Sequence, residues 1–351
     1  MRRLTRLWEQ HDDDSVYIVA ELSANHNQRH EYAIDLIHAA KDGGADAVKI
    51  QTYTPDTITI NSNAKWFRID RGTIWDGQTL YELYREAATP WEWQPELQQL
   101  ANDLDMEFFS SPFDHTAVDF LEKLNVPAYK VASFELVDIP LIEKIAATGK
   151  PIIFSTGMAT AEEIEEAIQA AKRAGASRFA LLKCTSAYPA LPEQANLRTI
   201  PDLMGRFRVP VGLSDHTFGI TVPVAAAALG ARIIEKHLTL SRKLGGPDST
   251  FSLEPSEFKA MVEAVRATEK SLGEVSYGPV GDEANNLTFR RSLFVVSDVR
   301  CGERLTEENV RSIRPGHGLH PRYLREIIGR RTARDIERGT PLAWELLEQN
   351  E

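Results

Sequence analysis

The chain has 351 residues, more than one hydrophobic core usually supports, so we expect one large domain and one small domain. Its 42% hydrophobic and 26% charged residues are typical of a folded globular protein and exclude a disordered or fibrous one. The formal net charge of −11 argues against nucleic acid as the main partner, because phosphate binding draws on a basic surface.

Cysteine use and hydropathy indicate the compartment. Cys184 and Cys301 lie far apart and follow no disulfide or metal-ligand spacing, which suits a reducing cytosol. The first 14 residues contain no apolar segment of the signal-peptide kind, and no later stretch has the roughly 18 uninterrupted apolar residues of a membrane span. We therefore expect a cytoplasmic protein without a membrane partner.

Short apolar runs alternate with segments of helical periodicity over residues 1–272. The expected strands lie near 17–22, 47–53, 106–111, 128–133, 151–156, 179–185, 209–214 and 231–237. Between two of them, residues 160–174 place apolar side chains at helical spacing after acids in the first turn. Such repeats indicate a parallel sheet, and eight units in about 250 residues match a (β/α)8 TIM barrel. A doubly wound open sheet is the alternative.

One insertion, residues 54–90, separates the second strand from its helix. It is rich in aromatic residues: Trp66, Phe67, Trp75, Tyr81 and Tyr84. A long loop at the top of a barrel is either a lid over the site or a packed excursion that covers the rim. Its residues alone favour neither reading.

The pattern changes after residue 272. Glycines and Pro279 mark a linker over 273–288, and short strand-like runs with glycine turns follow over 289–351. Between Phe289 and Leu342 there are 12 arginines and 7 acidic residues, so a basic module follows an acidic domain. This asymmetry fits an arginine-rich cap near an anionic ligand, but a solvated surface or an acidic partner face explains it too.

Polar residues concentrate at the C-terminal ends of the expected strands, where a barrel displays its chemistry. They are Glu21, Lys49, Gln51, Ser110, Ser111, Lys130, Ser133, Ser155, Thr156, Thr185, Ser186, Tyr188, Ser214, His216 and His237. One such residue usually forms a cap or a satisfied hydrogen bond. A ring of them around one mouth suits an anionic substrate.

Two subsets indicate distinct chemistry. Lys49 and Lys130, with the serines around them, suit a cradle for phosphate and carboxylate, although a Schiff-base lysine of an aldolase or a simple rim ion pair stays open. His216 and His237 end neighbouring strands and suit a metal site with open positions, which favours manganese or magnesium over a closed zinc site. For either histidine alone, a hydrogen-bonded core residue is the simpler reading.

Several runs resemble the signatures of the sialic-acid synthase family. They are residues 20–27 (AELSANHN), 49–53 (KIQTY), 110–113 (SSPF), 129–133 (YKVAS), 155–158 (STGM), 183–189 (KCTSAYP), 212–217 (GLSDHT), 235–237 (EKH) and 314–318 (RPGHG). The last run resembles the antifreeze-like (SAF) domain that these synthases carry after their barrel. The resemblance covers nearly the whole chain.

The resemblance implies a TIM barrel, a small C-terminal SAF domain and a domain-swapped homodimer. It also implies a divalent metal ion, with Mn²⁺ expected and Mg²⁺ or Co²⁺ open. The implied reaction joins phosphoenolpyruvate to an N-acetylated amino-sugar aldehyde, with the metal polarising the aldehyde and phosphate leaving by carbon–oxygen cleavage.

The resemblance also assigns roles. Phosphoenolpyruvate would be held by Lys49, Ser111, Lys130, Ser133, Ser155, Ser186 and Ser214, and the metal by His216 and His237. The sugar acceptor would contact Glu21, Gln51, Tyr188 and Asp248, with Phe289 and Arg314 arriving from the partner subunit. Glu21, His237 and Asp248 would be the catalytic residues. Ser186 departs from the asparagine common in this family, but its hydroxyl still donates to phosphate.

A second set of runs resembles the branch of the family that makes pseudaminic acid. They are residues 53–57 (YTPDT), 72–77 (GTIWDG), 80–84 (LYELY), 89–93 (TPWEW) and 318–321 (GLHP). The acceptor of that branch is 2,4-diacetamido-2,4,6-trideoxy-L-altrose, and an aromatic pocket wall suits its missing hydroxyl. N-acetylneuraminate and legionaminate synthases are the alternatives, and an amino-sugar-binding protein is the alternative that is not an enzyme.

Overall fold

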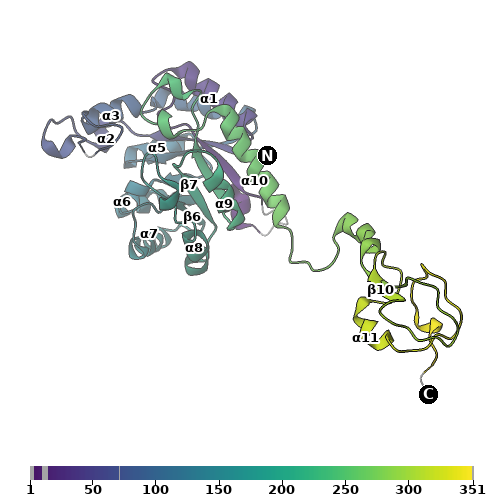
Figure 1. The fold of residues 1–351 in the computed structure, drawn as a ribbon. Helices are drawn as coiled ribbons and strands as arrows, with labels where there is room; N and C mark the ends of the chain where they lie inside the picture. The colour runs from purple at the N-terminus through teal and green to yellow at the C-terminus, as the bar shows by residue number, and fades with distance from the viewer. Residues whose placement is uncertain (1–3, 10–14, 71, 350–351) are drawn as a thin grey trace. The chain divides into compact units, whose positions relative to one another are not determined.

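The computed structural model describes residues 4–9, 15–70 and 72–349. The chain divides into two compact units, Met1–Gly273 and Glu274–Glu351, each described by itself below (Figure 1). Of the N-terminal stretch considered for a signal peptide, residues 1–3 and 10–14 lie outside the described residues. Within the described ranges, no helix is long and apolar enough to cross a membrane.

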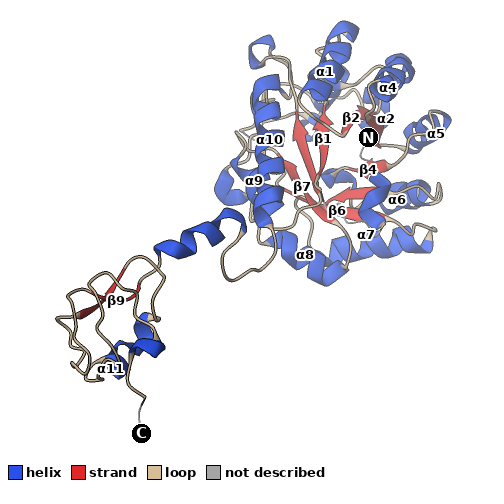
Figure 2. Cartoon of the chain, turned by 90° about the vertical axis from the view of Figure 1, so that its right-hand side faces the viewer, coloured by secondary structure: helices blue, strands red, loops and turns tan. Residues whose placement is uncertain are grey.

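The first unit is a closed barrel of parallel strands in sequence order, ringed by helices (Figure 2). The strands are β1 (Tyr17–Glu21), β2 (Ala47–Thr52), β3 (Glu107–Pro112), β4 (Tyr129–Val131), β5 (Ile152–Ser155), β6 (Phe179–Cys184), β7 (Val211–Asp215) and β8 (Ile233–His237). Strand β8 pairs with β1 and so closes the barrel. The predicted TIM barrel is confirmed, and the open sheet is wrong.

Helices cover the outside of the barrel. They are α1 (His30–Asp42), α4 (Gln94–Asp103), α5 (His115–Lys123), α6 (Ile139–Ala146), α7 (Ala161–Arg173), α8 (Thr199–Phe207), α9 (Thr221–Ala228) and α10 (Pro255–Leu272). Helix α7 illustrates why they form. Thr160 caps its N-terminus by accepting from the N–H of Glu163, and the Glu163 carboxylate accepts from the N–H of Thr160 in return. Its apolar face, predicted from spacing, is buried.

The inward faces of the strands change from apolar to polar toward their C-terminal ends. Tyr17, Val19, Phe109, Ile153 and Leu182 fill the lower barrel. Because strand side chains alternate between two faces, the next inward positions are two residues further along. Those positions hold ionisable and hydroxyl groups, so the fold itself collects a polar layer at one end.

The insertion at 54–90 forms short elements that extend from the barrel (Figure 1). They are α2 (Pro55–Ile58), the 3-10 turn η2 (Lys65–Phe67) and α3 (Leu80–Ala87). Other 3-10 turns of this unit are η1 (Leu4–Trp8), η3 (Trp91–Trp93), η4 (Ser133–Glu135), η5 (Pro192–Gln194), η6 (Arg242–Leu244) and η7 (Ser249–Phe251). Trp75, between η2 and α3, contacts Tyr188, so the insertion reaches residues that follow the barrel strands.

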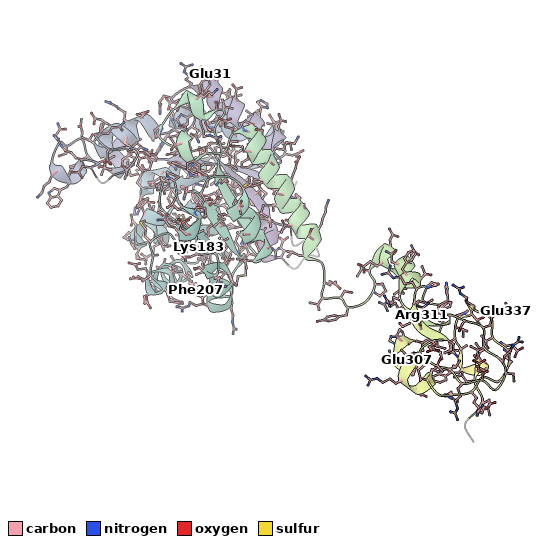
Figure 3. The ribbon with its side chains drawn as sticks, viewed as in Figure 1. Glu31, Lys183, Phe207, Glu307, Arg311 and Glu337 are labelled. Carbon is pink, nitrogen blue, oxygen red and sulfur yellow. The ribbon has the colours of Figure 1, made fainter. Side chains whose placement is uncertain are left out.

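The second unit has its own small core. The turn η8 (Gly281–Phe289) precedes an antiparallel pair, β9 (Ser292–Val295) and β10 (Val310–Ile313), followed by η9 (Pro321–Tyr323), α11 (Leu324–Ile327) and η10 (Trp344–Leu346). Leu293, Val295, Val310 and Ile327 are buried in it. Charged side chains cover the outside, including Glu307, Arg311 and Glu337 (Figure 3).

Candidate active site

The inward side chains at the C-terminal end of the barrel form a cluster of opposite charges. Lys49 on β2 forms an ion pair with Glu21 on β1, and its ammonium lies 3.8 Å from one oxygen of Glu235 on β8. Lys130 on β4 lies 4.0 Å from the other oxygen of Glu235. All four side chains are buried. Glu235 therefore bridges the two lysines, and the cluster is balanced in charge before any substrate enters.

Burial and neighbouring charges separate the pKa values of this cluster. Burial raises the pKa of Glu21 to about 7, although the Lys49 ammonium opposes the shift. At Glu235 burial also acts upward, but Lys130 and Lys49 outweigh it and lower the pKa. At Lys130 burial prevails and lowers the pKa, whereas at Lys49 burial is outweighed by Glu21 and Glu235, which raise it. Glu235 is thus the fixed anion, and Glu21 exchanges a proton near neutral pH.

Serine hydroxyls contact the charged groups. The Lys49 ammonium donates to Ser111 Oγ at 3.3 Å, and the Lys130 ammonium donates to Ser155 Oγ at 2.6 Å. Ser214 Oγ donates to the Glu235 carboxylate at 3.0 Å. These serines belong to β3, β5 and β7, so hydroxyl groups from several strands converge on one mouth.

A second set of hydroxyls surrounds Gly157, shortly after β5. The Gly157 N–H donates to Ser133 Oγ at 3.2 Å. A Cβ at this position would lie 2.7 Å from Ser133 Oγ and 2.2 Å from Ser186 Oγ, closer than real Cβ atoms approach. Only glycine brings the backbone this near to both hydroxyls. The resulting group of short polar donors has the chemistry that a phosphate group prefers.

His216 and His237 lie side by side, with ring centroids 5.2 Å apart. His216 Nδ1 lies 3.0 Å from the carbonyl oxygen of Thr185. Because a carbonyl only accepts, Nδ1 carries the hydrogen in this bond, and Nε2 keeps a lone pair for a metal ion. His237 Nδ1 is buried and has no hydrogen-bond partner among the described residues. Two neighbouring imidazoles, each with an uncommitted nitrogen, fit a divalent ion that takes two protein ligands.

The two histidines differ in their readiness to bind a cation. Burial, together with nearby cations such as His216, lowers the pKa of His237 well below its usual value, so its imidazole is neutral. At His216 burial acts downward, but the Cys184 thiol outweighs it and raises the pKa. No group of three or more His, Cys, Asp or Glu side chains that could hold a metal occurs in the part of the chain described.

Asp248 lies beside the histidine pair. Its carboxylate is 3.9 Å from His237 Nδ1 and accepts a hydrogen bond from Ser23 Oγ. Burial raises the pKa of Asp248, with the hydrogen bond from Ser23 acting in the opposite sense. Gln51 Nε2 donates to the same Ser23 oxygen at 3.4 Å. Ser23, which was given no role from the sequence, therefore connects two residues that were expected to contact the acceptor.

Tyr188 packs against three aromatic rings. Its ring centroid lies 4.6 Å from that of His216, 5.2 Å from that of Phe251 and 5.4 Å from that of Trp75. The rings come from the segments after β6, β7 and β8 and from the insertion. One side of the mouth is therefore aromatic, next to the histidine pair.

Phe289 and Arg314 lie in the second unit, and both are exposed there. Phe289 ends η8, and Arg314 follows β10 directly. The structure brings the other expected site residues together in the barrel unit, and it leaves the positions of these two relative to the barrel undetermined.

Two carboxyl groups were missed from the sequence. Glu235 lies two residues before His237 on the same face of β8, so strand alternation would have found it. Glu135 follows Ser133 in η4, and burial raises its pKa to about 7. One Glu135 oxygen, Oε2, is buried without a hydrogen-bond partner among the described residues. No periodicity indicates Glu135, because it lies in an irregular turn.

Comparison with known proteins identifies the relatives of this chain. The NeuB family matches residues 36–277, and the SAF domain matches residues 290–348. The pseudaminic acid synthase of Helicobacter pylori is 48% identical, covering 95% of this chain and 98% of that protein. The N,N'-diacetyllegionaminic acid synthase of Legionella pneumophila is 36% identical, covering 95% of this chain and 94% of that protein.

Among solved structures, the N-acetylneuraminic acid (sialic acid) synthetase of Leptospira borgpetersenii superposes with a TM-score of 0.69 at 32% identity. The match covers 78% of this chain and 90% of that one. The barrel, the SAF region that follows it and the extent of the sequence matches all indicate the same family. This chain belongs to the NeuB family.

Proposed function

We propose that the protein condenses phosphoenolpyruvate with 2,4-diacetamido-2,4,6-trideoxy-L-altrose and water, giving pseudaminic acid and phosphate. The observation that carries this proposal is the placement of Lys49, Lys130 and the serines beside a pair of histidines in one barrel mouth. Relatives named pseudaminic acid synthase share more of their sequence with this chain than those named legionaminic acid synthase do, which supports the altrose as acceptor.

The lysine cluster supplies the anion site. In the free enzyme Glu21 and Glu235 face Lys49 and Lys130, and phosphoenolpyruvate brings a carboxylate and a phosphate of its own. We assign both lysines and Ser111, Ser133, Ser155, Ser186 and Ser214 to these two groups. Donors that are fixed by the fold need no reorganisation when charge develops on the departing phosphate, and this lowers the barrier.

A divalent metal ion held by His216 and His237 would supply Lewis-acid polarisation of the acceptor aldehyde, with manganese our first choice. Gln51, Tyr188 and Asp248 would orient the acceptor. The π electrons of phosphoenolpyruvate form the new carbon–carbon bond to the aldehyde carbon, while the π electrons of the aldehyde carbonyl move onto its oxygen, which takes up a proton and becomes a hydroxyl. Water adds to the former enol carbon and loses a proton, and the carbon–oxygen bond then breaks with its electron pair leaving on phosphate.

We assign Glu21 the role of accepting the proton that the attacking water loses. Its pKa of about 7, raised by burial, lets it accept and return a proton near neutral pH. Glu135, with a pKa that burial also raises to about 7, is a second carboxyl group beside the serine cradle with the same capacity. Glu21 is buried and Glu135 is half-buried.

We further propose that the active form is a domain-swapped homodimer, in which Phe289 and Arg314 of one subunit reach the barrel mouth of the other. Support comes from the basic composition of the module that carries them and from their exposure in the second unit. An arginine guanidinium suits an acetamido or carboxylate oxygen of substrate.

The test is phosphate release from phosphoenolpyruvate with Mn²⁺ and three acceptors: the altrose, N-acetylmannosamine and the legionaminate precursor. Release with a kcat/KM far higher for the altrose than for the other two acceptors supports the proposal. Release with another acceptor alone would keep the reaction and overturn the substrate. No release, with a lysine trapped by borohydride, would indicate an aldolase, and acceptor binding without release would indicate a sugar-binding protein.

A further inference from the structure

Trp75 lies at the tip of an ordered turn within the insertion. The turn is closed by hydrogen bonds from Ile69 N–H to Gln78 O and from Gly77 N–H to Ile69 O, each 2.9 Å long. Inside it, Asp76 accepts from the N–H groups of Gly72 and Thr73. Hydrogen bonds among the described residues therefore hold this turn, and the Trp75 side chain extends from it toward the rest of the barrel unit.

Two contacts attach Trp75 to the rim of the barrel. Its indole N–H donates to the carbonyl oxygen of Pro247 at 2.8 Å, and its ring lies against that of Tyr188. Tyr188 is assigned to the acceptor and Pro247 directly precedes Asp248, so the two contacts reach one acceptor residue and the neighbour of another. A cavity of about 230 Å³ lies beside this attachment, and Trp75 and Pro247 are among the residues that line it. Trp75 is thus held at the rim and is only half-buried.

The hydrogen bond to Pro247 determines what Trp75 offers to a ligand. Indole has one polar group, its N–H, and that group is already engaged. The rest of the ring is apolar carbon. A hydroxyl pressed against it would lose water without gaining a hydrogen bond, whereas a methyl group would gain contact area.

We propose that Trp75 is a specificity-determining residue that packs on the acceptor sugar and favours a 6-deoxy carbon over a hydroxymethyl group. The inference deepens the proposed function and rests on it, because it takes the acceptor to bind beside Tyr188 and Asp248. It assigns the insertion a direct part in acceptor choice, where its sequence left a lid and a packed excursion equally open.

The experiment compares Trp75→Ala, Trp75→Phe and Trp66→Ala with the wild type. Trp66 is the matched control, because it belongs to the same insertion but is 76% exposed and has the Lys65 ammonium over its ring. Steady-state phosphate release is measured with the altrose and with N-acetylmannosamine. Circular dichroism melting establishes that each variant is folded, which we expect because Trp75 lies at the rim and not in the core.

In Trp75→Ala we expect the KM for the altrose to rise about tenfold, the size of effect that one missing apolar contact produces in a hydrophobic pocket. The KM for phosphoenolpyruvate should stay within about twofold, since only uniform acceptor binding is lost. The kcat/KM ratio of altrose to N-acetylmannosamine should fall toward one. Trp75→Phe should keep part of that ratio, because an apolar ring remains, and Trp66→Ala should match the wild type.

An altrose KM and an acceptor ratio in Trp75→Ala equal to those of the wild type would overturn this inference and leave the proposed function standing. An equal loss in Trp66→Ala would also overturn it, because the effect would then belong to the insertion as a whole. A wild type that uses none of the acceptors would overturn the proposed function and this inference together.

Discussion

Lys236 forms a buried ion pair with Asp215 on the outer face of the barrel, between the two strands that lead to His216 and His237. The same ammonium donates to the carbonyl oxygen of Thr217. Asp215 also accepts from the Thr217 N–H at 3.1 Å and from its hydroxyl at 2.9 Å. Lys236, the neighbour of His237, therefore contacts both residues that flank His216. We infer that this ion pair helps to fix the distance and orientation between the two imidazoles.

Replacing Lys236 by Met should weaken metal binding, because residues that orient metal ligands typically contribute about 10–100-fold in affinity. We expect Mn²⁺ binding, measured by the electron paramagnetic resonance signal of the free ion, to weaken by about tenfold. Binding of phosphoenolpyruvate in the absence of metal should be unchanged.

The control is Arg266→Met, which removes an ion pair to Asp46 with an N–O distance of 3.1 Å and leaves the histidines untouched. Equal Mn²⁺ affinity in the wild type and in Lys236→Met would mean that the Lys236–Asp215 pair serves only stability. An equal loss of Mn²⁺ affinity in Lys236→Met and Arg266→Met would also mean that the Lys236–Asp215 pair has no specific effect on the histidines.

His237→Ala should abolish turnover and leave the fold intact. The His237 Nδ1 atom has no hydrogen-bond partner among the described residues, so its removal strands no buried donor or acceptor in the protein. A site with one remaining imidazole would hold the ion too weakly. Phosphate release and the thermal midpoint are the two readouts, and turnover at the wild-type rate would contradict the metal assignment.

Lys130→Met should raise the KM for phosphoenolpyruvate by about 100-fold, since a hydrogen bond to a charged group contributes roughly 1.5–3 kcal/mol. The KM for the acceptor should change little. Glu235 keeps Lys49 as a partner at 3.8 Å, so the variant should still fold.

Lys183→Met is the matched control for Lys130→Met. Lys183 also lies on a barrel strand, but its ammonium donates to the carbonyl oxygen of Cys184 at 2.7 Å and to Thr185 Oγ1 at 3.3 Å and not to the charged cluster. Its phosphoenolpyruvate KM should equal that of the wild type. A rise confined to the acceptor KM in Lys130→Met would contradict the assignment of Lys130 to phosphoenolpyruvate.

The sequence was sufficient for the barrel and for the ring of polar strand ends, because both depend on local alternation. Ile153 and Ser155 illustrate this: once one position faces inward, the position two residues later does too. The Lys236–Asp215 pair could not be found in this way. It depends on the register between β7 and β8, which no single strand specifies.

The contact of Trp75 with Tyr188 was beyond the sequence for a different reason. The two residues are far apart in the chain, and an irregular turn carries one of them. Glu135 is a similar case, since its raised pKa comes from burial of a turn and not from any spacing. Periodicity predicts which face of a regular element is buried, but it does not predict what a loop covers.

Glu21→Gln should flatten the pH dependence of stability of the metal-free protein. The unfolded chain releases this proton near pH 4.5, whereas burial holds it in the folded protein to about pH 7. The free energy of unfolding therefore falls as the pH rises between these values and levels off above them.

Urea unfolding at pH 5 and pH 8 provides the measurement for Glu21. The drop between the two pH values should be smaller in Glu21→Gln than in the wild type by roughly 2–3 kcal/mol, because about two pKa units of the shift lie between pH 5 and pH 7 and each is worth about 1.4 kcal/mol. Equal drops in the two proteins would mean that Glu21 is already ionised in the folded protein at pH 5.

Arg314→Ala should raise the KM for the acceptor more than that for phosphoenolpyruvate, because we assign its guanidinium to the sugar. Arg311→Ala is the control, since Arg311 is exposed on β10 in the same unit, three residues earlier. A rise confined to the phosphoenolpyruvate KM would contradict the assignment.

Coexpression of Arg314→Ala with Lys130→Met tests whether Arg314 acts across subunits. In a domain-swapped heterodimer, one site combines the intact barrel of the first variant with the intact second unit of the other. A fraction of the sites should then recover the wild-type KM for both substrates, although neither variant has it alone. If Arg314 served the barrel of its own chain, every site in the mixture would carry one of the two substitutions, and no such fraction would appear.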